Sequence, residues 1–108
     1  MKQYKIEITE LAERDMESIG DYIAYELRNP MAAVNVVKGI RTRINSLLYF
    51  PEGNELDEDE ILACLGIRKT YYNRYKIYYI VYQNTIYIVR ILHMLVDSKI
   101  ILYNTFEI

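Results

Sequence analysis

The stretch RYKIYYIVYQNTIYIVRIL, residues 74–92, decides the fold. Its Tyr, Ile and Val residues favour strands, and Asn84 tolerates the positive φ of a tight turn between them. The stretch therefore predicts a β-hairpin with strands over residues 74–82 and 86–92. Alternation along the first strand puts Arg74, Lys76, Tyr78, Ile80 and Tyr82 on one face and Tyr75, Ile77, Tyr79 and Val81 on the other.

Both faces of this β-hairpin are largely apolar, so each needs a cover. A sheet that is packed on one side only normally has a polar second face. We expect the face with Tyr75 to complete the core and the other face to be covered by the C-terminal segment or by another chain. The 12 tyrosines also have a simple interpretation, in which most of them fill a small core.

The residues before the β-hairpin predict one strand and two helices. Residues 4–9 alternate between apolar and polar, which is the period of a half-buried strand. Residues 10–27 carry an apolar stripe at spacings of three and four, typical of an amphipathic helix. Asn29 and Pro30 cap a second helix whose stripe ends at Leu47, and the short link predicts an antiparallel helical hairpin.

Three shorter segments complete the expected topology. Residues 51–60 form an acidic connection, either a solvated loop or a surface that docks a basic partner. Residues 65–70 predict a short strand, and residues 97–103 fit a short helix and an edge strand equally well. The expected fold class is α+β, in the order β-α-α-β-β-β and then a short C-terminal segment. An N-terminal strand and an antiparallel helical hairpin pack on a small, mainly antiparallel sheet.

The composition fits one folded domain over residues 1–108, since 52% of the residues are hydrophobic and 26% are charged. No apolar stretch approaches the roughly 18 residues needed to span a bilayer. The N-terminus does not resemble a signal peptide, so we expect a cytoplasmic protein without membrane contact. The single cysteine, Cys64, lies in an apolar run, where we expect burial to make its thiol inert.

The formal net charge of −2 argues against a protein that grips nucleic acid by bulk electrostatics. The charge is uneven, however, because six acidic residues fall between Glu52 and Glu60 and the chain beyond Gly66 is mostly basic. Cations from neighbouring strands could converge on a phosphate or a carboxylate. They are Arg68, Lys69, Arg74 and Arg90.

The only histidine, His93, follows the second strand of the β-hairpin. It could act as a general acid or base, or serve only as a structural hydrogen-bonding group. One cysteine and one histidine do not make an ordinary zinc site, and the sequence has no GxGxxG or P-loop motif. We therefore expect neither a metal nor a cofactor.

Short motifs along nearly the whole chain resemble the RelE/ParE superfamily of bacterial toxins. Those of the first half are Asp21-Tyr22-Ile23-Ala24, Asn29-Pro30-Met31-Ala32-Ala33 and Phe50-Pro51-Glu52-Gly53. Those of the second half are Ile67-Arg68, Asn73-Arg74-Tyr75-Lys76-Ile77-Tyr78-Tyr79 and Ile88-Val89-Arg90-Ile91-Leu92-His93. The resemblance implies a toxin of a type II toxin–antitoxin, or plasmid stabilisation, system. A co-expressed antitoxin would wrap around the toxin, and growth would stop when the antitoxin is degraded.

Within this superfamily, RelE-like members cut messenger RNA on the ribosome, whereas ParE-like members poison DNA gyrase without nuclease chemistry. The basic cluster that commonly follows the family's histidine is replaced here by Met94-Leu95-Val96. RNA cleavage needs cations to stabilise the charge that builds on the phosphate, and this replacement removes some of them. In this respect the chain resembles the ParE-like members more than the RelE-like members. The resemblance thus implies gyrase inhibition by protein contact. The surface expected to bind antitoxin and target contains Arg74, Lys76, Tyr78 and Tyr82.

Two alternatives remain open from the sequence. One is a ribosome-dependent messenger RNA endoribonuclease that acts on ribosome-bound mRNA. Its catalytic residues would be Arg68, Arg74, Arg90 and His93. The other is a non-toxic relative that works as a binding module.

Overall fold

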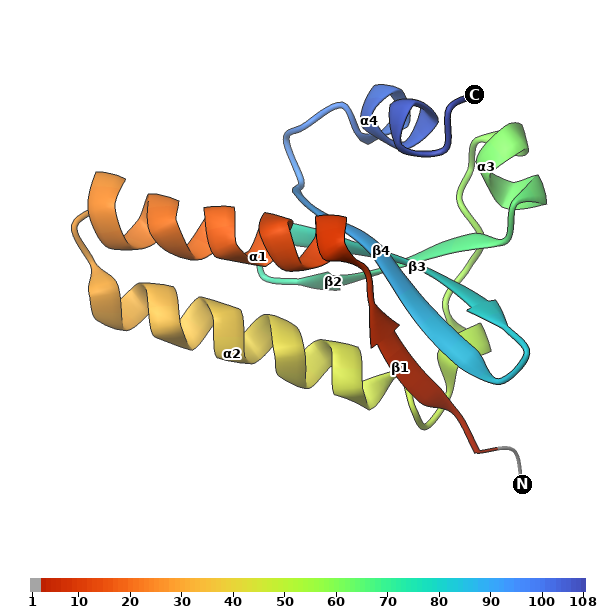
Figure 1. Ribbon diagram of the computed structural model, residues 1–108, viewed down its shortest axis with the longest axis horizontal. Coiled ribbons are helices and arrows are strands. Elements are labelled where there is room, and N and C mark those ends of the chain that lie inside the picture. Colours follow the sequence, from red (N-terminus) through yellow and green to blue (C-terminus); the bar gives the residue numbers. More distant parts are fainter. Residues whose placement is uncertain (1–2) are drawn as a thin grey trace.

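A mixed four-stranded sheet in the order β1-β4-β3-β2 organises the molecule (Figure 1). The computed structural model describes residues 3–108. The strands are β1 (Lys5–Ile8), β2 (Ile67–Tyr72), β3 (Tyr75–Tyr82) and β4 (Thr85–His93). Strand β1 is parallel to β4, and β4, β3 and β2 form an antiparallel meander. The predicted α+β class and β-hairpin are confirmed, and the strand predicted over residues 65–70 begins two residues later.

Left-handed residues form the tight turns of the meander. Gln83 and Asn84 have φ angles of 48° and 63°, which gives the two-residue turn expected at Asn84. Asn73, with φ of 54°, makes the turn between β2 and β3. Asparagine tolerates this region better than most residues, because its short side chain can bond to the local backbone. The second turn places Arg74 at the end of the sheet.

The helical hairpin also forms as predicted, with α1 (Glu10–Asp21), a π-helical turn η1 (Tyr22–Glu26) and α2 (Pro30–Ser46). The Thr9 hydroxyl accepts a hydrogen bond from the Ala12 N–H at 3.2 Å. The Asn29 side chain accepts one from the Ala32 N–H at 3.1 Å. Each cap satisfies an amide that has no partner within its helix. Within residues 3–108, no helix combines the length and apolarity needed to cross a membrane.

One face of the sheet packs on α1 and α2 and forms the helical-face core. Its buried members come from α1, from α2 and the residue after it, and from β3 and β4: Ala12, Met16, Ile40, Ile44, Leu47, Ile77, Tyr79, Ile86, Ile88 and Ile91. Gly39 lets α2 approach β2, since a Cβ there would lie only 2.0 Å from the Tyr72 ring. This face therefore depends on close packing of aliphatic side chains.

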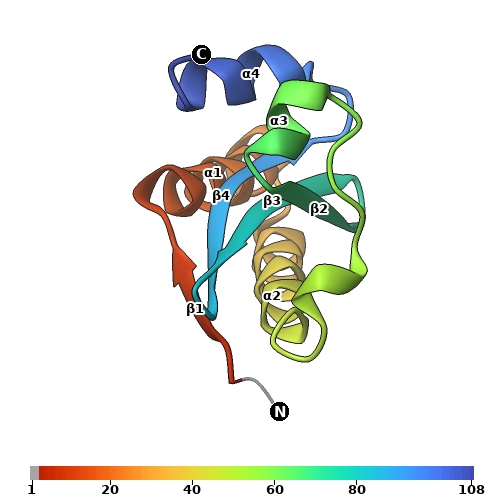
Figure 2. The same cartoon turned by 90° about the vertical axis from the view of Figure 1, so that its right-hand side faces the viewer.

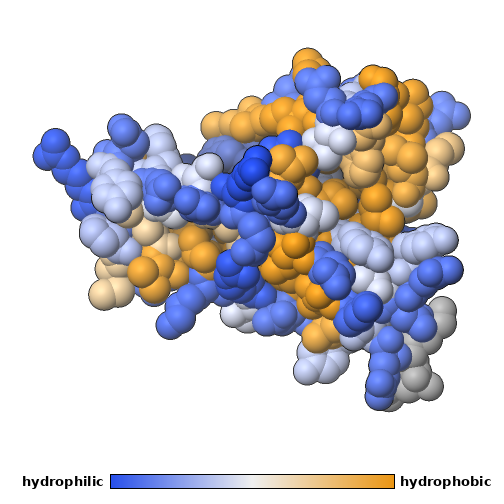
Figure 3. All heavy atoms as spheres, viewed as in Figure 1, coloured by the Kyte–Doolittle hydropathy of each residue, from blue (hydrophilic) through white to orange (hydrophobic). Residues whose placement is uncertain are grey.

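The opposite face is covered by two short helices, α3 (Glu60–Cys64) and α4 (Ser98–Thr105) (Figure 2). Together they bury the C-terminal-face core: Leu62, Ile67, Tyr78, Val89, Leu92 and Leu102. A bulge in β4 changes the register between Tyr78 and Tyr79, so that Val89 has no direct partner and faces this core. The C-terminal segment is thus a helix that covers the second apolar face, one of the two covers expected. Hydrophobic residues gather over α4 in Figure 3. On this helix Ile100 remains 61% exposed.

Two expectations about the middle of the chain are wrong in part. The acidic connection is more ordered than a solvated loop, because the Asp57 N–H donates to the Ile67 carbonyl at 2.8 Å and Leu56 pairs with Arg68 beside β2. Asp57 itself is buried. Cys64 is exposed, contrary to the expected burial, since α3 turns Leu62 and not Cys64 toward the sheet.

Candidate functional site

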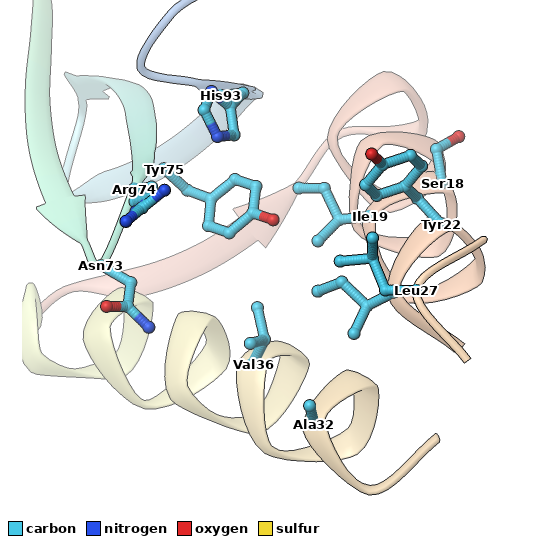
Figure 4. Close-up of a pocket in the computed structure, with 11 residues that line it drawn as sticks. Ser18, Ile19, Tyr22, Leu27, Ala32, Val36, Asn73, Arg74, Tyr75 and His93 are labelled. Carbon is cyan, nitrogen blue, oxygen red and sulfur yellow. The ribbon is translucent and has the colours of Figure 1, made fainter. Parts of the chain in front are cut away.

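A groove of about 750 Å³ opens between the tip of the helical hairpin and the turn that joins β2 to β3. We call it the tip groove. Its lining residues are Ser18, Ile19, Tyr22, Ile23 and Leu27 from α1 and the end of η1, Ala32 and Val36 from α2, and Asn73, Arg74, Tyr75 and His93 from the sheet. Figure 4 shows Leu27 and Arg74 at opposite ends, with the Tyr75 ring between them. The groove is mainly apolar and polar at its sheet end.

The helical wall depends on the π-helical turn. The Leu27 N–H donates to the Tyr22 carbonyl at 3.1 Å, an i to i+5 bond that widens the helix before the chain reverses. Arg28 then takes a left-handed φ of 52°, and Asn29 caps α2. Tyr22 and Leu27 are both left 56% exposed on this wall. Such turns are frequent at functional sites, and here one presents two large apolar side chains to solvent.

The sheet wall is built around Tyr75 and His93. These residues are opposite each other in β3 and β4, and their rings make an edge-to-face contact with centroids 5.5 Å apart. Burial, with a smaller effect from Tyr22, raises the pKa of the Tyr75 phenol, so it stays a neutral hydrogen-bonding group. The His93 Nδ1 atom accepts a hydrogen bond from the Leu95 N–H at 3.1 Å, which leaves Nε2 to carry the proton.

Arg74 is the charged residue of the groove. It is exposed in the β2–β3 turn, and no ion pair joins it to an acidic residue within residues 3–108. None of the described lining residues is an aspartate or glutamate. The guanidinium therefore has its donors free for an anionic group that enters the groove.

The four residues predicted for a nuclease do not converge. Arg68 donates to the backbone carbonyls of Glu52 and Asn54. Arg90 makes a two-pronged ion pair with Asp15 of α1, at 2.8 and 2.9 Å, and also bonds to Thr105 of α4. Hydrogen bonding to Asp15 raises the pKa of Arg90. The structure brings together only Arg74 and His93.

The predicted contact residues Arg74, Lys76, Tyr78 and Tyr82 do not share one surface. Tyr78 is only 2% exposed, so its expected place on an open face is wrong, because α4 covers that face. Lys76 donates to the Val96 carbonyl at 3.2 Å, and burial followed by repulsion from Lys69 lowers its pKa. Tyr82 is 60% exposed at the other end of β3 from Arg74.

A second polar site, unrecognised from the sequence, lies between α3, the start of α4 and strands β2 and β3. We call it the acid–lysine cluster, and its charged residues are Asp57, Glu58, Asp59, Asp97, Lys69, Lys76 and Lys99. Lys69 pairs with Glu58 and Lys99 pairs with Asp59, both at 3.1 Å. Hydrogen bonding to Lys69 lowers the pKa of Glu58. The cations of this cluster are therefore largely neutralised by acids of the same chain.

The tip groove could hardly be predicted from the sequence. Ile19, Ile23 and Leu27 belong to the apolar stripe that predicts α1, but the stripe does not reveal that its last turn overhangs the sheet. The one local signal was the combination of an Asn-Pro cap with a tyrosine-rich segment before it. Tyr22 and Tyr75 are joined only by the fold, since they lie on different elements.

Comparisons with known proteins agree with this geometry. A family model described as "ParE toxin of type II toxin-antitoxin system, parDE" matches residues 6–97. No curated protein matches the chain significantly. Among solved structures, the chromosomal ParDE system of P. aeruginosa has a TM-score of 0.71 at 20% identity, covering 84% of this chain and 96% of that one.

Two further solved structures share the fold. The toxin–antitoxin complex RelBE2 of Mycobacterium tuberculosis has a TM-score of 0.62 at 19% identity, over 84% of this chain and 98% of that one. A mutant of the E. coli toxin RelE in the free state has a TM-score of 0.64 at 13% identity, over 97% and 96%. These likenesses establish the fold, and the family match covers most of the chain. The chain belongs to the ParE toxin family of type II toxin–antitoxin systems.

Proposed function

We propose that this chain arrests growth by binding DNA gyrase in the cytoplasm, as a protein–protein inhibitor, and that a cognate antitoxin neutralises it. Its membership in the ParE family supports the toxin class. The resemblance of the chain to ParE-like members supports gyrase as the target. The proposal needs no metal and no cofactor.

The main support for this proposal is that the arginines predicted for a nuclease lie apart from one another. Cleavage of RNA requires several donors that surround the same phosphate, and the loss of one such donor costs about 100-fold to 1,000-fold in rate. Arg68 is held by backbone carbonyls and Arg90 by Asp15, so neither is free to reach a substrate near Arg74. An apolar groove with a single free arginine suits a protein partner better than a phosphodiester.

Exposed apolar residues around the helical tip support contact with proteins. Tyr25 is 76% exposed and Met31 is 70% exposed, next to the groove residues Tyr22 and Leu27 in the chain. Clusters of large exposed apolar residues commonly mark interaction sites. Tyrosine and arginine are also enriched among the residues that dominate binding energy at interfaces.

The test is a gyrase supercoiling assay with the purified full-length chain. We expect supercoiling to fall in proportion to the added protein, while messenger RNA from induced cells stays intact. Restored supercoiling on addition of the antitoxin would show that the inhibition is specific. Unchanged supercoiling at a large molar excess of the chain contradicts the gyrase target.

The endoribonuclease stays as the second candidate because Arg74 and His93 do lie in one groove. A reduced set of this kind could contact one phosphate. In that case primer extension after induction would show cuts at codon boundaries, and Arg74→Ala would abolish them. If induction of the chain without its antitoxin leaves growth unchanged, the protein is a non-toxic binding module instead.

A further inference from the structure

We propose that the solvent side of the helical hairpin is a dimerisation surface, on which a second copy of this chain binds with its α1 against α2 of the first. The proposal does not depend on the identity of the toxin's target. The surface centres on a shallow apolar groove of about 360 Å³ between the two helices, which we call the hairpin seam. Its lining residues are Gly20 of α1 and Ala33, Val34, Val37, Lys38 and Arg41 of α2.

The floor of the hairpin seam is apolar and is left open by Gly20. Gly20 and Val37 lie side by side across the two helices, since a Cβ on Gly20 would be 3.4 Å from the Val37 Cγ2 atom. Val34 stands beside this space and is 53% exposed, whereas the neighbouring Ala33 is buried. Covering such apolar surface with a partner is favourable by roughly 25 cal/mol per Å². The seam therefore gains from an apolar occupant.

Opposite charges border the hairpin seam on its two sides. Glu13 and Glu17 are about one helical turn apart on α1, and Lys38 and Arg41 are about one turn apart on α2. Glu13 and Arg41 form an ion pair across the seam at 3.2 Å, and each stays 47% exposed. Glu17 and Lys38 are exposed, and neither forms an ion pair within residues 3–108. The surface is thus acidic along α1, basic along α2 and apolar between them.

This charge pattern disfavours partners of uniform charge and fits the same surface on a second copy. A nucleic acid, or a protein surface of one sign, would meet like charge on one of the two helices. The basic residue of α1, Arg14, does not alter the pattern, because it is paired with Glu10. In a symmetric dimer each copy offers the same surface to the other, so a surface with both signs can be complementary to itself. The second copy is therefore the occupant that the charges select.

The two-fold axis of such a dimer can run along the helices or across them, and only one choice matches the charges. The helices α1 and α2 lie side by side and run in opposite directions (Figure 1). An axis along the helices places α1 of each copy on α2 of the other, whereas an axis across them places α1 on α1. The second arrangement brings acidic residues together, and the first brings acids onto bases. The axis therefore runs along the helices.

Contacts within one copy set the register of the dimer. The ion pair of Glu13 with Arg41 and the approach of Gly20 to α2 fix which residues lie level across the seam. Glu17 lies midway between Glu13 and Gly20 on α1 and is therefore level with Lys38 on α2. An axis along the helices preserves each level, so Glu17 of one copy faces Lys38 of the other, and this contact occurs twice.

The size of the surface predicts a weak, reversible dimer. Helix α2 has 17 residues, which gives a length of about 25 Å. Two neighbouring helices, each about 10 Å wide, then offer roughly 500 Å² per copy, near the low end for specific association. We expect a dissociation constant on the order of 10 μM. The described lining residues of the tip groove and of the hairpin seam are different, so the tip groove stays open in this dimer.

The experiment measures the mass of the full-length chain by analytical ultracentrifugation, over concentrations from about tenfold below to about tenfold above the expected dissociation constant. Three variants change the surface: Val34→Glu, Glu17→Lys and Lys38→Glu. Two matched controls lie elsewhere: Ile100→Glu on α4, where Ile100 is 61% exposed, and Lys5→Glu on the edge strand β1. Thermal melts check that all five variants fold.

We expect the wild-type chain to approach the mass of a dimer at the highest concentrations. Each substitution counts twice in a symmetric dimer, so Val34→Glu should weaken it at least about 30-fold, because two carboxylates would be buried in the apolar seam. Glu17→Lys and Lys38→Glu should each weaken it about tenfold, because two attractions become repulsions. The controls should stay within about twofold, since they lie far from the seam.

A mixture of the Glu17→Lys and Lys38→Glu variants tests the self-complementary contact directly. One copy of a mixed dimer has two bases at this contact and the other has two acids, so both contacts are attractive. We expect the mixture to form dimers with nearly the wild-type affinity, although each variant alone is mainly monomeric. Association of the mixture also shows that neither variant is misfolded.

Three outcomes overturn the inference in distinguishable ways. If the wild-type chain stays monomeric at the highest concentration, no second copy binds, and loss of gyrase inhibition in Val34→Glu would then assign the seam to the target protein. If a dimer forms and persists in both Val34→Glu and Lys38→Glu, it uses another surface. If the mixture of the two charge variants stays monomeric, α1 of one copy does not face α2 of the other.

Discussion

The two faces of the sheet are covered in different ways. On the helical face, two long helices bury a large aliphatic cluster around Ile40 and Tyr79, both fully buried. On the C-terminal face, α4 has only two buried residues, Ser98 and Leu102. The first cover is held mainly by packing, and the second also depends on polar contacts along its sides.

Those polar contacts link α4 to two elements directly and, through Arg90, to a third. The Tyr103 hydroxyl donates to the Asp59 carboxylate at 2.8 Å, which ties α4 to the start of α3. Arg90 of β4 bonds to Thr105 at 3.0 Å and to Asp15 of α1. A short helix with little buried area gains from such contacts, because they fix its position on the sheet. The contrast shows that the two apolar faces of one β-hairpin can be buried by helices that differ in length and in the kind of contact that holds them.

The largest effect is expected from Ile40→Ala in the helical-face core. Ile40 is completely buried, so its truncation should lower the free energy of unfolding by about 4 kcal/mol through lost burial and a residual cavity. Urea denaturation followed by circular dichroism measures this change. Ile100→Ala removes the same side chain from an exposed position and should cost no more than about 0.5 kcal/mol. Equal losses for the two variants would contradict the packing of this face.

Asp15→Ala should have the next largest effect, about 3 kcal/mol, because it leaves the Arg90 guanidinium half-buried without its partner. It also removes the acceptor of the Ile91 N–H at 2.9 Å, beside the bulge. The same urea titration measures it. Combining Asp15→Ala with Arg90→Met should recover much of the loss, since no unpaired charge then remains. An additive loss in the double variant would show that the ion pair is not the cause.

Leu102→Ala tests the weaker cover directly. Leu102 is fully buried, but α4 can shift to fill the space, so we expect a loss near the low end of the usual range, about 2 kcal/mol. Native-state hydrogen exchange should show faster exchange in α4 and little change in α1 and α2. Asn104→Ala, on the exposed side of the same helix, is the control. Uniformly faster exchange throughout the chain would mean that both faces unfold together.

The smallest effect is expected from lowering the pH, which should loosen α4 through the protonation of Asp59. Hydrogen bonding from Tyr103, with further contributions from the Leu62 N–H and Lys99, lowers the pKa of Asp59 below its ordinary value of 3.8. A lowered carboxylate pKa stabilises the folded state above the unfolded value and loses this contribution as pH falls through the folded value. Below about pH 3.8 the amide NMR signals of α4 should therefore shift before those of α2. In Asp59→Asn this pH dependence should disappear, and its persistence would assign it to another group.

Much of the fold could be predicted because its signals are local. Period-two alternation predicts β1, the spacing of apolar residues predicts α1 and α2, and the turn at Asn84 fixes the register of β3 and β4. The caps at Thr9 and Asn29 form as expected, since a cap bonds to an amide three residues away. The order of these elements follows from the same local signals and is the order expected from the RelE/ParE resemblance.

The candidate site could be predicted only in part. Arg74 and His93 were recognised and do lie together, but Arg90, Arg68 and Tyr78 were assigned to surfaces that they do not share. An arginine on a strand gives no local sign of its partner, and Asp15 lies 75 residues away from Arg90. The burial of Tyr78 likewise depends on α4, whose pattern fits a helix and a strand equally well.

The sequence by itself determined the elements, their caps, their turns and the apolar character of both faces of the β-hairpin, because these depend on residues close together in the chain. Only the tertiary structure decided which face α4 covers, which arginines are neutralised and where the tip groove opens. The groove exists because the helical hairpin places the π-helical turn after α1 beside the β2–β3 turn, which lies far from it in the chain. No local pattern encodes such a meeting, since it is set by packing between distant segments.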